Sequence, residues 1–152
     1  MPAWTSQFER LLRALHRVEH ADGDATARLD DLYSFFQNCW HLKDWIQNDG
    51  SVPKATRDAI LREVKTTESL LICADIANGS KHLVLKRARK GASIFRTKVS
   101  TVDVKTGRVL SEEDVFGISW RQGVPQPHGI VELARKAVDD WRTMIKKHGL
   151  GA

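Results

Sequence analysis

The residues best suited to chemistry lie in one short stretch, Leu70–Leu83, where an otherwise apolar run carries isolated polar side chains. Asp75, Asn78 and His82 interrupt this run, and Lys81 directly precedes the histidine. Residues three or four positions apart share a face of an α-helix, so a helix would place the carboxylate, the amide and the imidazole along one side. Burying such groups is costly unless each has a polar partner. The spacing therefore predicts either a buried polar network or a functional site.

Acid–base chemistry is the first interpretation of this stretch. The imidazole of histidine titrates near neutral pH, so His82 is a candidate general acid or base. Asn78 and Asp75 would position it or the attacking group, and Lys81 would hold a phosphate and stabilise developing negative charge. RNA supplies its own nucleophile, the 2′-hydroxyl, so this chemistry would need no metal and no other cofactor.

A metal site is the second interpretation. Glu68, Asp75 and His82 repeat at intervals of seven residues, which on a straight helix separates neighbours by about 10 Å, too far for one ion. A metal would need further ligands from another helix, and His41 and Asp44, about one turn apart in the preceding helical run, are the candidates. The Glu-x-x-His pattern of di-iron helices is absent from the third helix.

The third interpretation is structural. Asp75, Asn78 and His82 would satisfy one another and a facing polar stripe across a helix interface. That stripe belongs to the preceding helix and contains Gln37, His41 and Asp44. Both stripes could equally face water, because every amphipathic helix has a polar side. The residues themselves leave these interpretations open.

A concentration of basic residues follows the polar stretch. The formal net charge of the chain is +5, and much of it comes from a short run. The candidate binding residues of this run are Lys86, Arg87, Arg89 and Lys90. With Phe95 as a stacking side chain, this pattern is typical of a surface that binds nucleic acid. A solvated loop followed by a charged edge strand is the alternative.

The elements that must position these residues are mostly helical. Apolar residues at spacings of three and four predict helices over about 4–18, 26–48, 53–78 and 129–147. Ser6 and Glu9 match a capping box and place the start of the first helix near residue 6. The second helix carries the broadest apolar face and is expected to be central. The third is expected to break near Thr66 and Thr67.

A β insertion is predicted at about residues 93–120, before the last helix. The run from Ser93 to Val104 is rich in β-branched residues, and Lys105–Arg108 forms a turn. A return begins at Val109, and a further apolar run covers Val115–Trp120, which gives an antiparallel sheet of two or three strands. The expected fold is therefore mainly α: an up-and-down bundle of about four helices with a small antiparallel β insertion.

Composition bounds the class of protein. With 152 residues, 41% of them hydrophobic and 28% charged, the chain is expected to form one globular domain over residues 1–152. Cys39 and Cys73 lack the spacing of a zinc site and are expected to be reduced and buried. The charged N-terminus does not resemble a signal peptide, and no apolar run reaches about 20 residues. A cytoplasmic protein without a membrane segment is expected.

The layout resembles the HEPN superfamily, helical domains that carry a polar motif ending in histidine late in their third helix. The resemblance covers roughly residues 5–83 and 129–147 and leaves the β segment as an insertion. It implies metal-independent cleavage of RNA, in a defence or toxin–antitoxin system, by a homodimer whose motif helices face each other. In that family the signature is an arginine, commonly a polar residue, and then four to six residues to the histidine.

This chain matches the signature only at His82. The positions five to seven residues before it are Ala77, Ile76 and Asp75, so the arginine is missing. Asn78 would replace the polar member, and Lys81 is basic but adjacent to the histidine. Family members without the signature are expected to be binding modules that lack catalysis. The expected function is therefore engagement of RNA or a nucleotide, with RNA cleavage by His82 as one form of it. The alternatives are an interaction module for an operon-encoded protein partner and a metal-binding helical protein.

Overall fold

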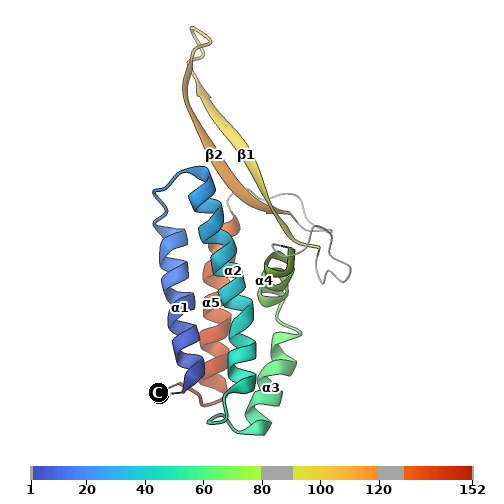
Figure 1. Ribbon diagram of the computed structural model, residues 1–152. Helices are drawn as coiled ribbons and strands as arrows, with labels where there is room; N and C mark the ends of the chain where they lie inside the picture. The colour runs from blue at the N-terminus through green and yellow to red at the C-terminus, as the bar shows by residue number, and fades with distance from the viewer. Residues whose placement is uncertain (1, 80–90, 120–128, 152) are drawn as a thin grey trace.

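Figure 1 shows a mainly helical protein from which a two-stranded hairpin projects, and the fold class expected from the sequence is confirmed. This computed structural model describes residues 2–79, 91–119 and 129–151. These residues form five helices and two strands. In chain order they are α1 (Ala3–Glu19), α2 (Ala25–Asn48), α3 (Lys54–Val64), α4 (Glu68–Gly79), β1 (Ser93–Val102), β2 (Val109–Ser119) and α5 (Gly129–Lys147).

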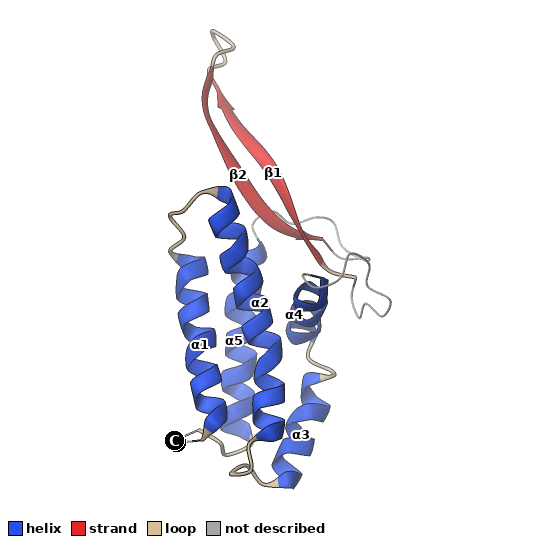
Figure 2. Cartoon of the chain, in the orientation of Figure 1, coloured by secondary structure: helices blue, strands red, loops and turns tan. Residues whose placement is uncertain are grey.

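Helix α2 is the centre of the bundle, as its broad apolar face predicts. It packs against α1, α3, α4 and α5, and Figure 2 shows these helices gathered around it. Phe35, Phe36 and Leu42 of α2 are fully buried, and so is Trp141 of α5. The indole nitrogen of Trp141 donates a hydrogen bond of 3.1 Å to the carbonyl oxygen of Cys39, which satisfies its one polar atom in the core.

The predicted third helix is divided in two at the expected place, so the bundle has five helices instead of about four. Helix α3 ends at Val64, and α4 begins at Glu68. The hydroxyls of Thr66 and Thr67 donate to the carbonyl oxygen of Glu63 at 3.1 and 2.8 Å. The backbone N–H of Thr66 donates to the same carbonyl at 3.1 Å, so the two hydroxyls add to an amide donor at the end of α3 and stabilise the break.

The start of α1 differs from the sequence prediction, and the capping box at Ser6 is wrong. The helix begins at Ala3, and its first amides are capped by Asp49 from the turn that follows α2. The carboxylate of Asp49 accepts the backbone N–H of Trp4 at 3.1 Å and also both the N–H and the hydroxyl of Ser51. These hydrogen bonds, those from Ser51 first, lower the pKa of Asp49 to about 2.

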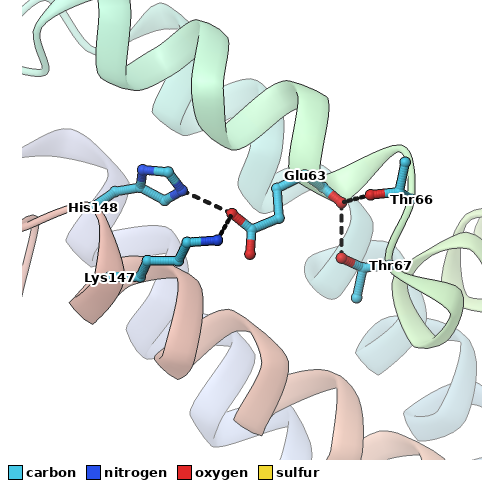
Figure 3. A network of polar contacts seen from close by, with 5 residues as sticks. All are labelled: Glu63, Thr66, Thr67, Lys147 and His148. Carbon is cyan, nitrogen blue, oxygen red and sulfur yellow. Dashed lines mark hydrogen bonds and ion pairs between the residues drawn. The ribbon is translucent and has the colours of Figure 1, made fainter.

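The end of α3 is tied to the end of α5 by the polar network in Figure 3. One carboxylate oxygen of Glu63 lies 2.8 Å from Nε2 of His148 and 3.1 Å from Nζ of Lys147. The hydrogen bond with His148, and then that with Lys147, lower the pKa of Glu63. This contact joins residues that are 85 positions apart in the chain.

The β insertion is a single antiparallel hairpin. Its register pairs Ser93 with Ser119 and continues to Thr101 with Ser111, beyond which a bulge shifts the pairing. The run from Val115 is the second half of β2 and not a third strand. At the base, Phe116 and Ile118 are buried in the core of the bundle. The far half extends beyond the helices (Figure 1).

A short loop closes the far end of the hairpin. The backbone N–H of Asp103 donates to the carbonyl oxygen of Arg108, and that of Gly107 donates to the carbonyl oxygen of Asp103, both at 2.8 Å. The carboxylate of Asp103 accepts the N–H of Lys105. Gly107 has a φ of 69°, a conformation that residues with a side chain rarely adopt. The loop is therefore specified by its own sequence.

Candidate functional site

Most of the residues predicted to act on phosphate fall outside the described residues. They are His82, Lys81, Lys86, Arg87, Arg89 and Lys90. The acid–base role of His82 and the binding role of the basic run stay predictions. Asn78 lies half-buried, one residue before the last described residue of α4.

Asp75 is buried in the middle of α4, with 1% of its surface exposed. Its Oδ2 accepts the backbone N–H of Ala92 at 3.4 Å, and Ala92 is itself buried. This bond links α4 to the residue that precedes β1. For Asp75 the contact favours the structural interpretation, in which a buried carboxylate satisfies a buried donor.

His41 and Asp44 lie on α2 and are both half-buried. The carboxylate of Asp44 forms an ion pair with Lys43, whose ammonium lies 4.7 Å from the centre of the Trp40 ring. Helix α2 packs against α4, so the two predicted polar stripes belong to neighbouring helices. Over residues 2–79, 91–119 and 129–151, however, no three histidine, cysteine, aspartate or glutamate side chains group closely enough to hold a metal ion.

The two cysteines lie between these helices and are free and buried, as predicted. Burial raises the pKa of the Cys73 thiol well above its usual value, and the neighbouring Cys39 thiol raises it further. A thiol that stays protonated is a poor nucleophile, so Cys73 is not suited to nucleophilic chemistry. Both cysteines are fully buried and act as small apolar groups in the α2–α4 interface.

A cavity that sequence reasoning missed lies where the hairpin meets the bundle. Its volume is about 390 Å³, within the range of small-molecule sites. Leu32 of α2, Phe116 of β2 and Ile130 of α5 line it with apolar surface, and Glu113 and Glu132 add carboxylates. The end of α1 supplies further wall residues, so four elements, α1, α2, β2 and α5, contribute to the wall.

Arg28 is the cationic residue in the wall of this cavity. Its Nη2 donates to the carbonyl oxygen of Asp114 at 3.0 Å, and its guanidinium carbon lies 5.4 Å from the centre of the Phe116 ring. Its Nε is enclosed and has no hydrogen-bond partner in the described part of the chain. In the sequence Arg28 is one polar residue in the first turns of α2, and 86 positions separate it from Asp114, so no local pattern indicates the cavity.

The far half of the hairpin is the other feature that the sequence did not single out. Every large hydrophobic side chain that is exposed among the described residues lies there: Val99, Val102, Val104, Val109 and Leu110. Val104, at the tip, is 97% exposed. The base of the hairpin carries an ion pair of 2.9 Å between Arg96 and Asp114, which lowers the pKa of the Asp114 carboxyl and raises that of the Arg96 guanidinium.

No family model, curated protein or solved structure matches this chain. Among the described residues, none of the helices is both long enough and apolar enough to cross a membrane. In the described part of the chain, the exposed hairpin and the cavity at its base are the features that support a proposal about function.

Proposed function

We propose that this protein is a non-catalytic interaction module whose helical bundle holds the β1–β2 hairpin out to a partner protein. The supporting observation is the exposure of the far half of the hairpin, from Val99 to Leu110, which carries all the exposed large hydrophobic side chains of the described residues. Five exposed large hydrophobic side chains gathered on one arm of an otherwise well-packed protein mark a candidate site of interaction.

The physical reason is the low stability of an unsupported two-stranded ribbon. With 10 and 11 residues, β1 and β2 are about twice the usual strand length and extend roughly 33 Å. Phe116 and Ile118 anchor the base, but beyond Arg96 and Asp114 no described element covers either face. A hairpin without a third strand or a covering helix is only marginally stable in water. A partner that covers the apolar tip would remove this exposure.

The charges favour a partner other than a second copy of this chain. Strand β1 presents Arg96 and Lys98, whereas β2 presents Glu112 and Glu113. A two-fold pairing of hairpin edges places β1 beside β1 or β2 beside β2, which brings like charges together. The hairpin as a whole also has no net charge. Its basic residues are Arg96, Lys98, Lys105 and Arg108, and its acidic residues are Asp103, Glu112, Glu113 and Asp114. A protein surface with an apolar patch fits this balance better than a nucleic-acid backbone.

Site-specific photo-crosslinking tests the proposal. A benzophenone amino acid at Val104 is expected to capture one protein from cells of the source organism, whereas the same group at the exposed Ala55 of α3 is not. The captured protein is then identified, produced in pure form and titrated against the whole chain. The double variant Val109→Ser, Leu110→Ser is expected to weaken binding about tenfold or more, because the apolar contacts of the interface centre are lost.

The controls separate binding from folding. Ser111→Thr, an adjacent change that keeps the strand, is expected to bind like the wild type. Circular dichroism and amide shifts of the Ser93–Ser119 strands check that each variant keeps its hairpin. Equal capture at Val104 and Ala55, or unchanged affinity in the double variant, would contradict the proposal. Capture of a second copy of the chain would contradict the argument from charge.

Engagement of RNA or a nucleotide is the second candidate function, and one observation favours it. Lys81, Lys86, Arg87, Arg89 and Lys90 lie within ten residues and carry as much positive charge as the net +5 of the whole chain. Lys and Arg that neutralise phosphates dominate the affinity of proteins for nucleic acid. In the HEPN-like form of this proposal a homodimer cleaves RNA without a metal, with His82 as the acid or base.

Total RNA incubated with the protein in the presence of a chelator tests this second candidate. Cleavage by the wild type that His82→Ala abolishes would support it, and equal absence of cleavage in both would remove the nuclease activity. Binding of an oligonucleotide that weakens as salt rises, with no cleavage, would leave an RNA-binding role. Light scattering during the same preparation measures the oligomeric state.

A further inference from the structure

We infer that the cavity at the junction of hairpin and bundle binds a small molecule that has an apolar body and a positively charged amine. This function is independent of the interaction proposed for the hairpin tip, because none of the five exposed tip residues lines the cavity. The volume of about 390 Å³ suits a ligand of roughly ten to twenty heavy atoms.

The apolar part of the wall defines where the body of the ligand lies. Leu32, Phe116 and Ile130 are buried core residues whose side chains reach the cavity from α2, β2 and α5. Val115 and Val131 widen this surface and are half-buried. Ligand pockets are generally lined in this way, with apolar side chains for affinity and a few polar groups that fix orientation.

The charged residues of the wall determine which sign of charge the ligand carries. Glu19, Glu113, Asp114 and Glu132 line the cavity against one cation, Arg28. Two of these carboxylates already have partners, because Glu19 is held by Arg135 and Asp114 by Arg96. The side-chain carboxylates of Glu113 and Glu132 have neither an ion pair nor a hydrogen bond with any described residue. Two carboxylates without a partner among the described residues, in the wall of an apolar cavity, attract a cation.

The positive charge of Arg28 does not change this preference for a cationic ligand. One of its nitrogens is already bound to the carbonyl oxygen of Asp114, and its guanidinium lies over the ring of Phe116. Its Nε is enclosed, so that atom offers no accessible donor to an anion in the cavity. Glu113 and Glu132 line the same cavity, and their carboxylates would repel an anion there.

Three probes of one shape and different charge test the inference on the whole chain. They are 2-phenylethylamine, 2-phenylethanol and 3-phenylpropionate, titrated separately and followed by amide chemical shifts. For so small a probe the dissociation constant of the amine is expected to be of the order of 1 mM. The amine is expected to bind about fivefold more tightly than the alcohol, and the carboxylate most weakly. Shifts are expected at Val115 and Val131, which line the cavity.

Matched variants locate the charge preference. Glu113→Gln and Glu132→Gln are each expected to reduce the amine's advantage over the alcohol about threefold or more, and to leave binding of the alcohol unchanged. Glu112→Gln, an exposed change on the same strand outside the cavity, is expected to have no effect. High salt is expected to reduce the preference, since rim charges are screened.

Three results would overturn the inference: no probe shifts the cavity residues, the carboxylate binds most tightly, or the double variant Glu113→Gln, Glu132→Gln binds the amine as the wild type does. If 3-phenylpropionate binds most tightly, the cavity is instead a site for an anionic ligand that pairs with Arg28. Melting curves of the variants confirm that any loss of binding is not a loss of fold. A failure here leaves the hairpin proposal untouched, and the reverse also holds.

Discussion

At the scale of single residues, the polar side chains of this protein act mainly by satisfying backbone groups. Asp49 caps a helix to which it does not belong, and Asp75 holds the backbone of Ala92 at the approach to the hairpin. Each carboxylate accepts a hydrogen bond from a backbone N–H that is shielded from water in the folded protein. Their contributions to stability are therefore separable from any role in binding or catalysis.

Asp49→Asn is expected to lower the melting temperature by a few degrees at neutral pH, because a charged acceptor for the amides of α1 is lost. The pKa of Asp49 is lowered in the folded protein from 3.8 to about 2. Its stabilising effect is therefore complete above about pH 4 and is lost as the pH falls from 3.8 towards 2. Thermal melts from pH 7 to pH 2 measure the difference between wild type and variant.

The difference between wild type and Asp49→Asn should stay constant above pH 5 and shrink below pH 4. Asp30→Asn, an exposed change on α2, serves as the control and should be close to wild type throughout. A gap that persisted unchanged to pH 2 would show that Asp49 does not act through its charged form.

Asp75→Leu is expected to destabilise the protein by about 1–3 kcal/mol, since the buried N–H of Ala92 loses its acceptor. Asp75→Asn, which keeps an acceptor oxygen, should cost less. Chemical denaturation measures both, and hydrogen exchange of the Ala92 amide should be faster in the leucine variant. Equal stability of the leucine variant and the wild type would rule out the structural role.

At the scale of elements, a polar network between distant helix ends fixes how the helices lie against one another. The break between α3 and α4 is stabilised by Thr66 and Thr67, and the same residue that accepts their hydroxyls, Glu63, also reaches α5 (Figure 3). Three helices are thus joined at one turn. The core supplies most of the stability, whereas this network fixes how α3 lies against α5.

Glu63→Gln is expected to destabilise the protein by no more than about 1 kcal/mol, since the ion pairs with Lys147 and His148 are partly exposed. The pKa of Glu63 is lowered in the fold, so its contribution is present above its ordinary value of 4.5 and disappears as the pH falls below it. Denaturation in urea at pH 7 and at pH 3 measures this. Asp58→Asn, which removes the charge from the more exposed pair with Lys54, is the comparison and should cost less.

At the scale of the whole molecule, the protein consists of a helical bundle and a projecting arm, the β1–β2 hairpin (Figure 2). The bundle buries the aromatic core, and the arm carries the exposed apolar residues. The cavity lies where the two meet. This division predicts that the arm can be shortened without unfolding the bundle.

Replacement of residues 99–113 by Asn-Gly would close the hairpin at the paired residues Lys98 and Asp114. The shortened protein is expected to unfold cooperatively, with a melting temperature within a few degrees of the wild type, and to lose partner binding. Calorimetry measures the unfolding, and titration with the partner identified by crosslinking measures the binding. A shortened chain that failed to fold would assign the arm a structural role instead.

The sequence by itself determined the elements, because their signals are local. Apolar spacing located the helices, Thr66 and Thr67 marked the break, and the turn at Lys105–Arg108 fixed the hairpin. The central position of α2 in the bundle was predicted from its broad apolar face. The choice between two strands and three did not follow, since β2 continues through Ser111, Asp114 and Gly117, residue types that often form turns.

Only the tertiary structure decided which distant residues meet. Asp49 replaces the local cap that Ser6 suggested, from 45 positions away along the chain; Glu63 meets His148 across 85 positions and Arg28 meets Asp114 across 86. Such pairs depend on how the helices pack, and no periodicity of neighbouring residues encodes them. The same reason hides the cavity, whose wall comes from four elements. Local spacing specifies which face of an element is buried, whereas packing specifies what that face meets.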